Sequence, residues 1–301
     1  MASLVLKEIH PAADVRAWYR RRLQLLARGM AQEMVDLVHQ HYSAPAVVAP
    51  SSSLGGTHQV TAGAAFDAEP EVGLRRAFAE WGVRWEQRFD RMAVEVAQLF
   101  AQRTRRSFDA AFKRLLRKSG FTVRFQASPR MVAAHRAIVG ENVALIRSIP
   151  RQFHQQVERL VTKAAMAGGA QRELSKSIRQ RYGVTFRRAA LIARDQSSKA
   201  KAVLESARRE DLGVVEAEWQ HSHAGKVPRP EHVRWGRERR RFDVTKGLWS
   251  KVDQEWQLPG TAINCRCASR SIIPDTFVRA SERAAIRRGA HDQASSTALS
   301  L

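Results

Sequence analysis

The sequence predicts an α+β protein, with a mainly helical N-terminal two-thirds that contains a long amphipathic helix and a small mixed α/β C-terminal domain with few strands. Through most of the chain before Gly213, apolar residues recur at steps of three and four, which is the period of an amphipathic helix. After Gly213 the runs are short, alternate between apolar and polar residues and are separated by glycine and proline, which is typical of strands.

The first predicted helix covers residues 14–40, within an N-terminal helical segment that we expect to span residues 1–42. Its apolar stripe consists of Leu23, Leu26, Met30, Met34 and Leu37. Residues 43–70 are dominated by Ala, Pro, Ser, Gly and Thr, and they have few apolar groups to offset the entropy of ordering. We therefore expect a flexible linker or a long excursion there.

A long amphipathic helix is predicted next, within a helical region that spans residues 71–185. It continues until Ser119-Gly120, since glycine is a usual helix stop. Its stripe favours core packing, and an exposed seam that binds a partner is the alternative. The stripe residues are Leu74, Phe78, Trp81, Trp85, Phe89, Met92, Val96, Leu99, Phe108, Phe112 and Leu115.

Shorter elements complete the predicted fold. A short strand is expected at residues 121–125. In the C-terminal domain, which we expect to span residues 186–274, strands are predicted at 214–221 and 263–273, with a weak hairpin around Phe242 and Trp249. The polar tail over residues 275–301 is expected to be loosely ordered. Further helices, each bounded by proline, a capping residue or glycine, are predicted at 129–146, 150–167, 171–182 and 185–212.

The composition restricts the partners and the compartment. The chain has 301 residues, 44% of them hydrophobic, and its 51 Lys and Arg against 29 Asp and Glu give a formal net charge of +22. This excess favours contact with nucleic acid, an acidic protein surface or anionic lipid, and a well-solvated basic surface is the alternative. Two cysteines argue against a disulfide-stapled secreted domain. We expect no signal peptide, no membrane partner and a reducing cytosol, because no apolar run approaches the roughly 20 residues of a membrane-spanning helix.

Two clusters of basic residues are candidate polyanion contacts, with a solvated face as the alternative for each. The first lies in the C-terminal third of the long helix and faces one acid, Asp109. Its members are Arg103, Arg105, Arg106, Lys113, Arg114, Arg117 and Lys118. The second surrounds Trp235, where arginine and an aromatic ring together can grip phosphates and stack on bases. Its members are Arg234, Arg237, Arg239, Arg240 and Arg241.

The two cysteines form the most specific chemical feature. On a strand, Cys265 and Cys267 would point to the same face, so that both sulfur atoms could reach one ion. Zinc takes cysteine sulfur and histidine nitrogen in a tetrahedral arrangement. The candidate zinc ligands are Cys265 and Cys267 together with His232 and His223, and His221 is a further candidate. The alternatives are two buried free thiols that pack as small apolar groups and a strained redox pair.

Enzyme motifs are missing from the sequence. We find no phosphate-binding glycine loop, no nucleophile-elbow serine and no His-Glu-x-x-His motif. Asp195 beside Arg194 is explained by a salt bridge or a helix cap. Cys265 and His232 could pair as nucleophile and base, but no third group that would orient the histidine is evident. We therefore expect a protein that is not an enzyme, with a Zn- or Cys-dependent enzyme as a remaining alternative.

A set of short motifs resembles the Mu F-like phage head morphogenesis proteins. The resemblance covers about residues 131–274 and departs from the family at Ala224, where Asp is frequent. The motifs are 141–146, Ile149-Pro150, 188–196, Trp219, Arg229, His232, Pro259-Gly260 and Asn264-Cys265-Arg266-Cys267.

The resemblance implies a structural minor head (capsid) protein of a tailed phage, bound at or near the portal and supporting head assembly and DNA packaging or ejection. The implied partners are the portal protein, the major capsid or scaffolding protein and phage DNA, which would be bound without sequence preference. The implied location is inside the head, near the portal, after assembly in the host cytoplasm. The residues expected to organise the Mu F-like C-terminal domain are Trp219, Arg229, His232, Cys265, Arg266 and Cys267. A non-specific nucleic-acid-binding protein that acts through its basic patches is the alternative function.

Overall fold

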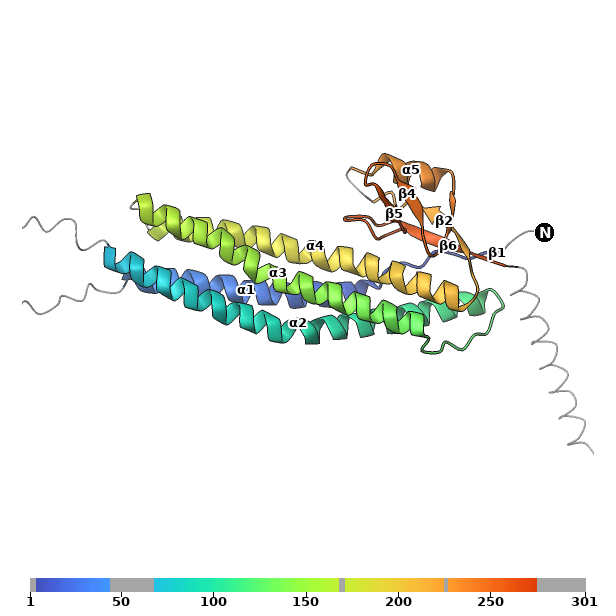
Figure 1. Cartoon of the computed structure of the whole chain (residues 1–301), viewed down its shortest axis with the longest axis horizontal. Helices are drawn as coiled ribbons and strands as arrows, with labels where there is room; N and C mark the ends of the chain where they lie inside the picture. Colours follow the sequence, from blue (N-terminus) through green and yellow to red (C-terminus); the bar gives the residue numbers. More distant parts are fainter. Residues whose placement is uncertain (1–3, 44–67, 168–170, 225–226, 275–301) are drawn as a thin grey trace, which may run out of the picture. The chain divides into compact units, whose positions relative to one another are not determined.

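The structure, a computed structural model, describes residues 4–43, 68–167, 171–224 and 227–274 (Figure 1). These ranges confirm the α+β class, since long helices make up most of the N-terminal part and a few antiparallel strands follow in the C-terminal part. Most of the predicted linker at 43–70 and the tail at 275–301 lie outside the described residues.

The chain divides into two compact units, and each is built from discontinuous segments. The first unit comprises Met1–Tyr19, Ala97–Glu141 and Ala193–Leu301. The second unit comprises Arg20–Val96 and Asn142–Ile192. Four long helices, α1 (Ala13–Ser43), α2 (Ala68–Lys118), α3 (Pro129–Ala167) and α4 (Gln171–Asp211), contribute segments to both units.

The long helix α2 confirms the prediction from its stripe. Met92, Leu99 and Leu115 are half-buried and the other stripe residues are buried, so the stripe packs into the core. The helix ends at Lys118, and Gly120 follows with a φ of 87° that favours glycine.

Two predicted helix breaks are wrong. The helices predicted at 129–146 and 150–167 form the single helix α3, which runs through Pro150. Proline inside a helix costs about 3 kcal/mol. Ile149 and Phe153 are each 1% exposed, and burying such a side chain contributes about 1.5–3 kcal/mol, so the two together offset that cost.

The break predicted at Gly183 is also absent, because α4 continues through it. An interior glycine costs only about 0.5–1 kcal/mol. The fully buried Ile178 and Ala189 flank it on the same helix and hold both halves against the core.

The strand predicted at residues 121–125 does not form, and the segment is irregular. Its apolar residues are instead anchored on helices of the first unit. Phe121 is buried, and the ring of Phe125 lies 5.8 Å from that of Phe112 on α2. The alternation of apolar and polar residues therefore reflects side chains that pack on a helix without any strand pairing.

The small sheet of the first unit has four antiparallel strands in the order β1-β6-β2-β3. They are β1 (Leu4–Val5), β2 (Glu216–Gln220), β3 (Arg241–Asp243) and β6 (Ala268–Ile273). The strand β2 confirms the prediction at 214–221, and β6 confirms only the second half of the strand predicted at 263–273. Because β6 begins at Ala268, Cys265 and Cys267 lie in the loop before it and not on a strand as predicted. The N-terminal strand β1, which was not predicted, pairs Leu4 with Ile273.

The predicted hairpin around Phe242 and Trp249 is wrong in its pairing. Phe242 lies on β3 and pairs with Ala217 of β2, whereas Trp249 pairs with Trp256. Trp249 and Trp256 belong to a separate hairpin formed by β4 (Leu248–Ser250) and β5 (Glu255–Gln257). The basic run around Trp235 contains the helix α5 (Pro230–Arg237), which has proline at its first position.

None of the helices in the described ranges has a stretch long and apolar enough to span a membrane.

Candidate functional site

A buried cluster in the first unit brings together most of the residues expected to organise the C-terminal domain. The strand β2 supplies alternate inward residues, and the helix α5 packs against β2 (Figure 1). Trp219 lies at the centre of the cluster with 0% of its surface exposed. The members are Ala217, Trp219, Trp235, Phe242, Val244, Cys265 and Cys267.

His232 projects from α5 into this cluster and lies between both thiols. Its Nδ1 is 3.5 Å from the Sγ of Cys265 and 3.9 Å from the Sγ of Cys267. One nitrogen of the ring and the two sulfur atoms all lie within 4.8 Å of one another. The ring is 3% exposed and packs edge-on against Trp219, with 4.9 Å between centroids, and stacks on Trp235.

The opposite edge of the imidazole is held by a polar relay. His232 Nε2 lies 2.8 Å from Oε1 of the buried Gln257. The amide nitrogen of Gln257 donates to Asp253 at 2.8 Å, so the amide oxygen faces the histidine. Nε2 therefore carries the proton and donates it to Gln257. The lone pair of Nδ1 consequently faces the two sulfur atoms.

The two thiols differ in acidity. The hydrogen bond from Cys267 and the neighbouring His232 outweigh burial and lower the pKa of Cys265 to about 4. The pKa of Cys267 is raised well above its ordinary value by the hydrogen bond to Cys265 and by burial. Both cysteines are free and buried. Cys265 is therefore the more acidic of the two thiols.

Two residues of α4 form hydrogen bonds with the loop before Cys265. Asn264 has a φ of 61°, its backbone N–H donates to Asp195 Oδ1 at 3.2 Å, and its side-chain oxygen accepts from Arg194. Burial raises the pKa of Asp195 despite these contacts. Sequence reasoning explained Arg194 and Asp195 by a local salt bridge or cap, but they also position the cysteine loop.

A buried charge network fastens α4 to β6, and sequence reasoning missed it. Glu205 accepts hydrogen bonds from Lys201 at 2.9 Å, Arg209 at 2.9 Å and Ser269 at 3.1 Å. Arg209 also donates to Ser271 at 2.9 Å. The three charged side chains are each 3% exposed. The only local signal was the spacing of four residues from Lys201 to Glu205 to Arg209, which is equally common on solvated helix faces.

The remaining predicted ligand and domain-organising residues lie around the cluster. His223 is exposed, has its ring 4.5 Å from that of His221, and is outside the group formed by His232 and the cysteines. Arg229 pairs with Asp253 at 3.3 Å and donates to the carbonyl of Ile263. Arg266 donates to the carbonyl of Ala224 at 2.7 Å.

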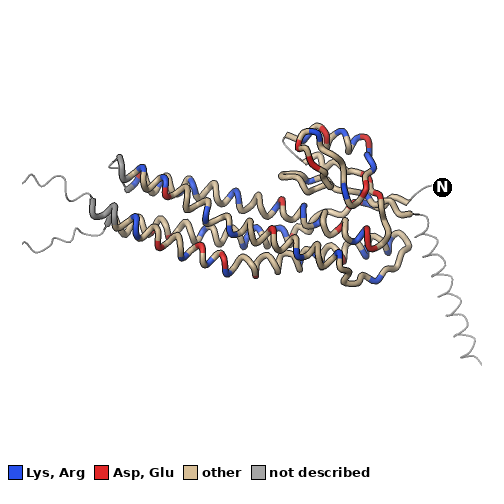
Figure 2. The backbone as a smooth tube through the Cα atoms, in the orientation of Figure 1, with Lys and Arg blue, Asp and Glu red and all other residues tan. Residues whose placement is uncertain are grey.

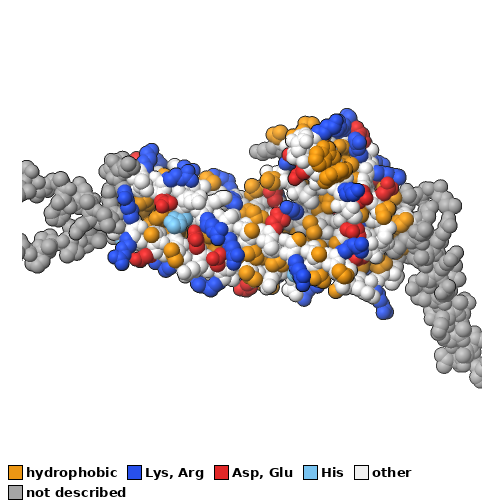
Figure 3. Space-filling view, viewed as in Figure 1, with side chains coloured by type: hydrophobic (Ala, Val, Ile, Leu, Met, Phe, Trp, Pro, Cys, Tyr) orange, Lys and Arg blue, Asp and Glu red, His pale blue; other side chains and the backbone are white. Residues whose placement is uncertain are grey.

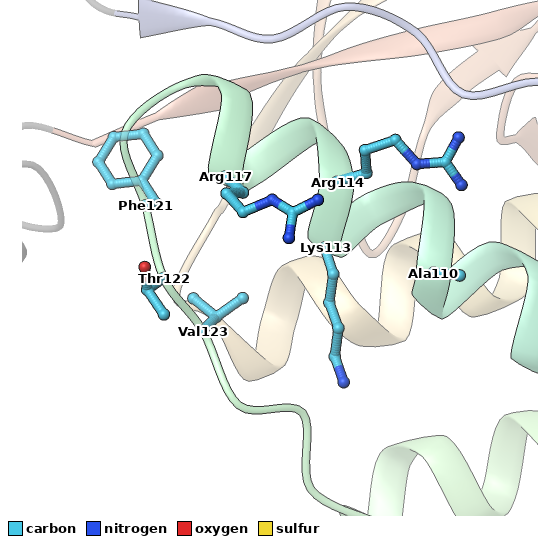
Figure 4. Close-up of a pocket in the computed structure, with 7 residues that line it drawn as sticks. All are labelled: Ala110, Lys113, Arg114, Arg117, Phe121, Thr122 and Val123. Carbon is cyan, nitrogen blue, oxygen red and sulfur yellow. The ribbon is translucent and has the colours of Figure 1, made fainter.

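The basic cluster predicted on α2 belongs to the first unit and lacks its expected acid. Asp109 accepts two hydrogen bonds, both at 2.9 Å, from the buried Arg208 of α4. Arg105 is half-buried and the other cations are exposed. Lys113, Arg114 and Arg117 line a pocket of about 310 Å³ beside residues 121–123, as Figure 4 shows.

The second basic cluster lies on α5, on β3 and in the turn between them. All five of its arginines are exposed. Arg240 pairs with Glu238 at 3.7 Å and Arg241 with Glu216 at 4.0 Å. Lys and Arg are also distributed along the long helices (Figure 2). The net charge is thus spread over the surface, with a local excess at the end of α2.

Comparisons with known proteins match part of the chain. A family model described as phage Mu protein F like protein matches residues 155–270, which confirms the resemblance for that range. An uncharacterized protein of Haemophilus influenzae (strain ATCC 51907 / DSM 11121 / KW20 / Rd) is 30% identical over 146 residues, which are 48% of this chain and 31% of that protein. The chain thus spans about a third of the length of this relative. No solved structure matches.

Proposed function

We propose that this chain, whose residues 155–270 belong to the phage Mu protein F like family, is a structural minor head protein of a tailed phage. In this proposal it binds at or near the portal, inside the head, and supports head assembly and DNA packaging or ejection. The observation that carries the proposal is the position of the family match, because it includes the whole buried cluster around Trp219.

A structural role, without catalysis, is supported by the burial of the reactive groups. Cys265 is 6% exposed, Cys267 is 5% exposed and His232 is 3% exposed. A substrate would need to reach these atoms, and the surrounding tryptophans cover them. The cluster therefore serves to fix the fold of the small domain.

A protein partner is supported by an exposed aromatic surface on the β4–β5 hairpin. Trp249 is 42% exposed, Trp256 is 58% exposed and Val252 in the turn between them is 73% exposed. The two indoles pack edge-on, with 5.7 Å between centroids. Hydrophobic side chains are also visible on the surface in Figure 3. Exposed aromatic side chains that adjoin one another are typical of protein-binding surfaces.

The proposal is tested by affinity capture of the full-length chain from cells in which the phage that encodes it assembles heads. We expect the portal protein, or another head protein, to be recovered in a fixed ratio after nuclease treatment and a high-salt wash. Trp249→Ser combined with Trp256→Ser should lower that recovery. Val215→Ser, which changes a residue that is 65% exposed outside the hairpin, should leave it unchanged. Recovery of nucleic acid alone, lost at high salt, would contradict the proposal.

A non-specific nucleic-acid-binding protein is the second candidate function, favoured by the α2 cluster. Lys113, Arg114 and Arg117 are exposed. The carboxylate of Asp109 does not neutralise them, because it pairs with Arg208. Cations of this kind neutralise phosphates and release counterions, which makes binding depend on salt. In the first proposal the same surface faces packaged DNA.

Replacing Lys113, Arg114 and Arg117 together with glutamine is expected to weaken binding to duplex DNA and to reduce its salt dependence. Each lost phosphate contact lowers the slope of log affinity against log salt by about 0.9. The measurement is fluorescence anisotropy of a labelled duplex at several salt concentrations. The control removes the same charge from three arginines that have acid partners, Arg76, Arg84 and Arg130. Equal slopes for both triple variants would show that α2 is not the DNA contact.

A further inference from the structure

We infer that His232, Cys265 and Cys267 form a binding site for a divalent metal ion of the zinc class. The ligand atoms are Nδ1 of His232 and the Sγ atoms of the two cysteines. The inference rests on these residues alone and does not depend on a role in phage heads.

The distances within the group match the edges of a zinc coordination tetrahedron. With Zn–S bonds of about 2.3 Å and Zn–N bonds of about 2.0–2.1 Å, a sulfur and a nitrogen on one tetrahedral zinc lie about 3.5 Å apart. The observed distances from Nδ1 to the sulfur atoms are 3.5 and 3.9 Å. A hydrogen bond would account for one sulfur beside Nδ1. The second sulfur at nearly the same distance is explained by a shared ion.

The surroundings of the histidine have the arrangement that supports a metal ligand. A metal-bound histidine almost always donates its other N–H to a carbonyl or carboxylate, which fixes the tautomer and the ring. Here Nε2 donates to Gln257, and Gln257 is itself held by Asp253. Arg229 pairs with Asp253 and extends the relay. The lone pair of Nδ1 is therefore available to coordinate an ion.

The indole of Trp219 provides a second, independent indication. Its N–H is buried and makes no geometrically satisfactory hydrogen bond in the part of the chain that the structure describes. An unpartnered buried donor is costly, at about 1–3 kcal/mol. Trp219 and Cys267 lie in the same buried cluster. A metal-bound thiolate at Cys267 would supply the missing acceptor.

Metal binding fits the group better than catalysis or a disulfide. A nucleophile and base pair needs one cysteine and access for a substrate, whereas both sulfur atoms here are buried around one nitrogen. A bridge between residues separated by one position is strained. Thiolate and imidazole ligands favour zinc over magnesium or calcium. The ion would join α5 to the loop before β6, since 33 and 35 positions separate His232 from the two cysteines.

The described group supplies three ligands, so His221 or a water would fill the fourth coordination position. His221 follows β2 and is buried, but it lies outside the group formed by His232 and the two cysteines. Closed structural zinc sites have four protein ligands, while a water completes an open one. The test below distinguishes the two.

The test is metal analysis of the full-length chain, followed by cobalt titration of the chelator-treated protein. We expect one zinc ion per chain, and a thiolate-to-cobalt charge-transfer band with tetrahedral d–d bands that saturate at one cobalt ion per chain. Cys265→Ser and Cys267→Ser should each abolish the charge-transfer band or reduce it. His223→Ala, which changes an exposed histidine outside the group, should retain both bands. Gln257→Ala should weaken metal binding by about 10–100-fold.

The wild-type titration decides the question even if the serine variants fail to fold. Loss of the tetrahedral bands in His221→Ala assigns the fourth position to His221, and their retention assigns it to water. A folded wild-type chain that binds neither ion in stoichiometric amount would overturn the inference. Equal loss of cobalt binding in His223→Ala would overturn this choice of ligands.

Discussion

Glu205→Ala is expected to lower the free energy of unfolding of the first unit by about 3–5 kcal/mol, because it leaves two buried cations without their counter-charge. Lys201 and Arg209 both donate to this carboxylate at 2.9 Å, and the side chains of all three residues are 3% exposed. The substitution would also remove the hydrogen bond that Ser269 of β6 donates to this carboxylate. Urea unfolding followed by circular dichroism measures the effect.

Glu210→Ala is the matched control, since it removes another glutamate from the same helix. Glu210 pairs with Arg130 at 3.1 Å, but the two side chains are 27% and 60% exposed. Exposed ion pairs contribute about 0–1 kcal/mol, so little change is expected. Similar losses for both variants would contradict the importance assigned to the buried network.

The same carboxylate should make stability depend on pH in the acid range. Arg209, Lys201 and Ser269 outweigh the opposing effect of burial and lower the pKa of Glu205 below its ordinary value of 4.5. A depressed folded-state pKa contributes stability that is present above the unfolded-state pKa and is lost as the pH falls through the folded-state value. We therefore expect the free energy of unfolding to decrease below about pH 4.5 more steeply in the wild type than in Glu205→Gln. Parallel curves for the two proteins would contradict this assignment.

Trp219→Ala is expected to lower the free energy of unfolding of the first unit by about 3–5 kcal/mol, as is usual when a large buried aromatic side chain is removed. Trp219 is 0% exposed and contacts His232, Trp235 and Phe242, with centroid distances of 4.9, 4.8 and 6.1 Å. The measurement is urea unfolding of the full-length chain.

Trp256→Ala controls for the removal of an indole, because Trp256 is 58% exposed on the β4–β5 hairpin. We expect a change within about 0.5 kcal/mol, since surface substitutions away from special features have small effects. If Trp256→Ala were as destabilising as Trp219→Ala, the hairpin would belong to the cooperative core.

The sequence predicted the helices well wherever one periodic stripe determines the structure. The aromatic stripe of α2 is buried because its spacing of three and four residues places every member on one face. The predicted breaks at Pro150 and Gly183 failed for a physical reason: each costs less than the burial of the neighbouring apolar side chains contributes. A proline or glycine in the sequence does not indicate how deeply its neighbours are buried, so it cannot predict that burial will offset its cost.

The site was predicted in part, through its chemical groups. Cysteine and histidine are rare enough in this chain that Cys265, Cys267 and His232 could be singled out, and the structure brings these three together. Gln257 and Asp253, which orient the histidine, are ordinary polar residues of a hairpin and carry no signal of their own. Their role depends on the fold of the β4–β5 hairpin.

Contacts between residues far apart in the sequence could not be predicted from local sequence patterns. The strand β1 pairs with β6 although some 270 residues separate Leu4 from Ile273. Arg194 and Asp195 hold Asn264 across about 70 positions. Nothing near either residue in the sequence specifies such a partner, because pairing over that distance is set by the packing of α4 and the sheet.

The most direct test of the account is the protein content of purified, DNA-filled heads of the phage that encodes this chain. After nuclease treatment and a high-salt wash, quantitative mass spectrometry should find the chain in a fixed ratio to the portal protein. Absence from the heads, or release together with surface-bound DNA, would contradict a structural role in the head and favour the nucleic-acid-binding alternative.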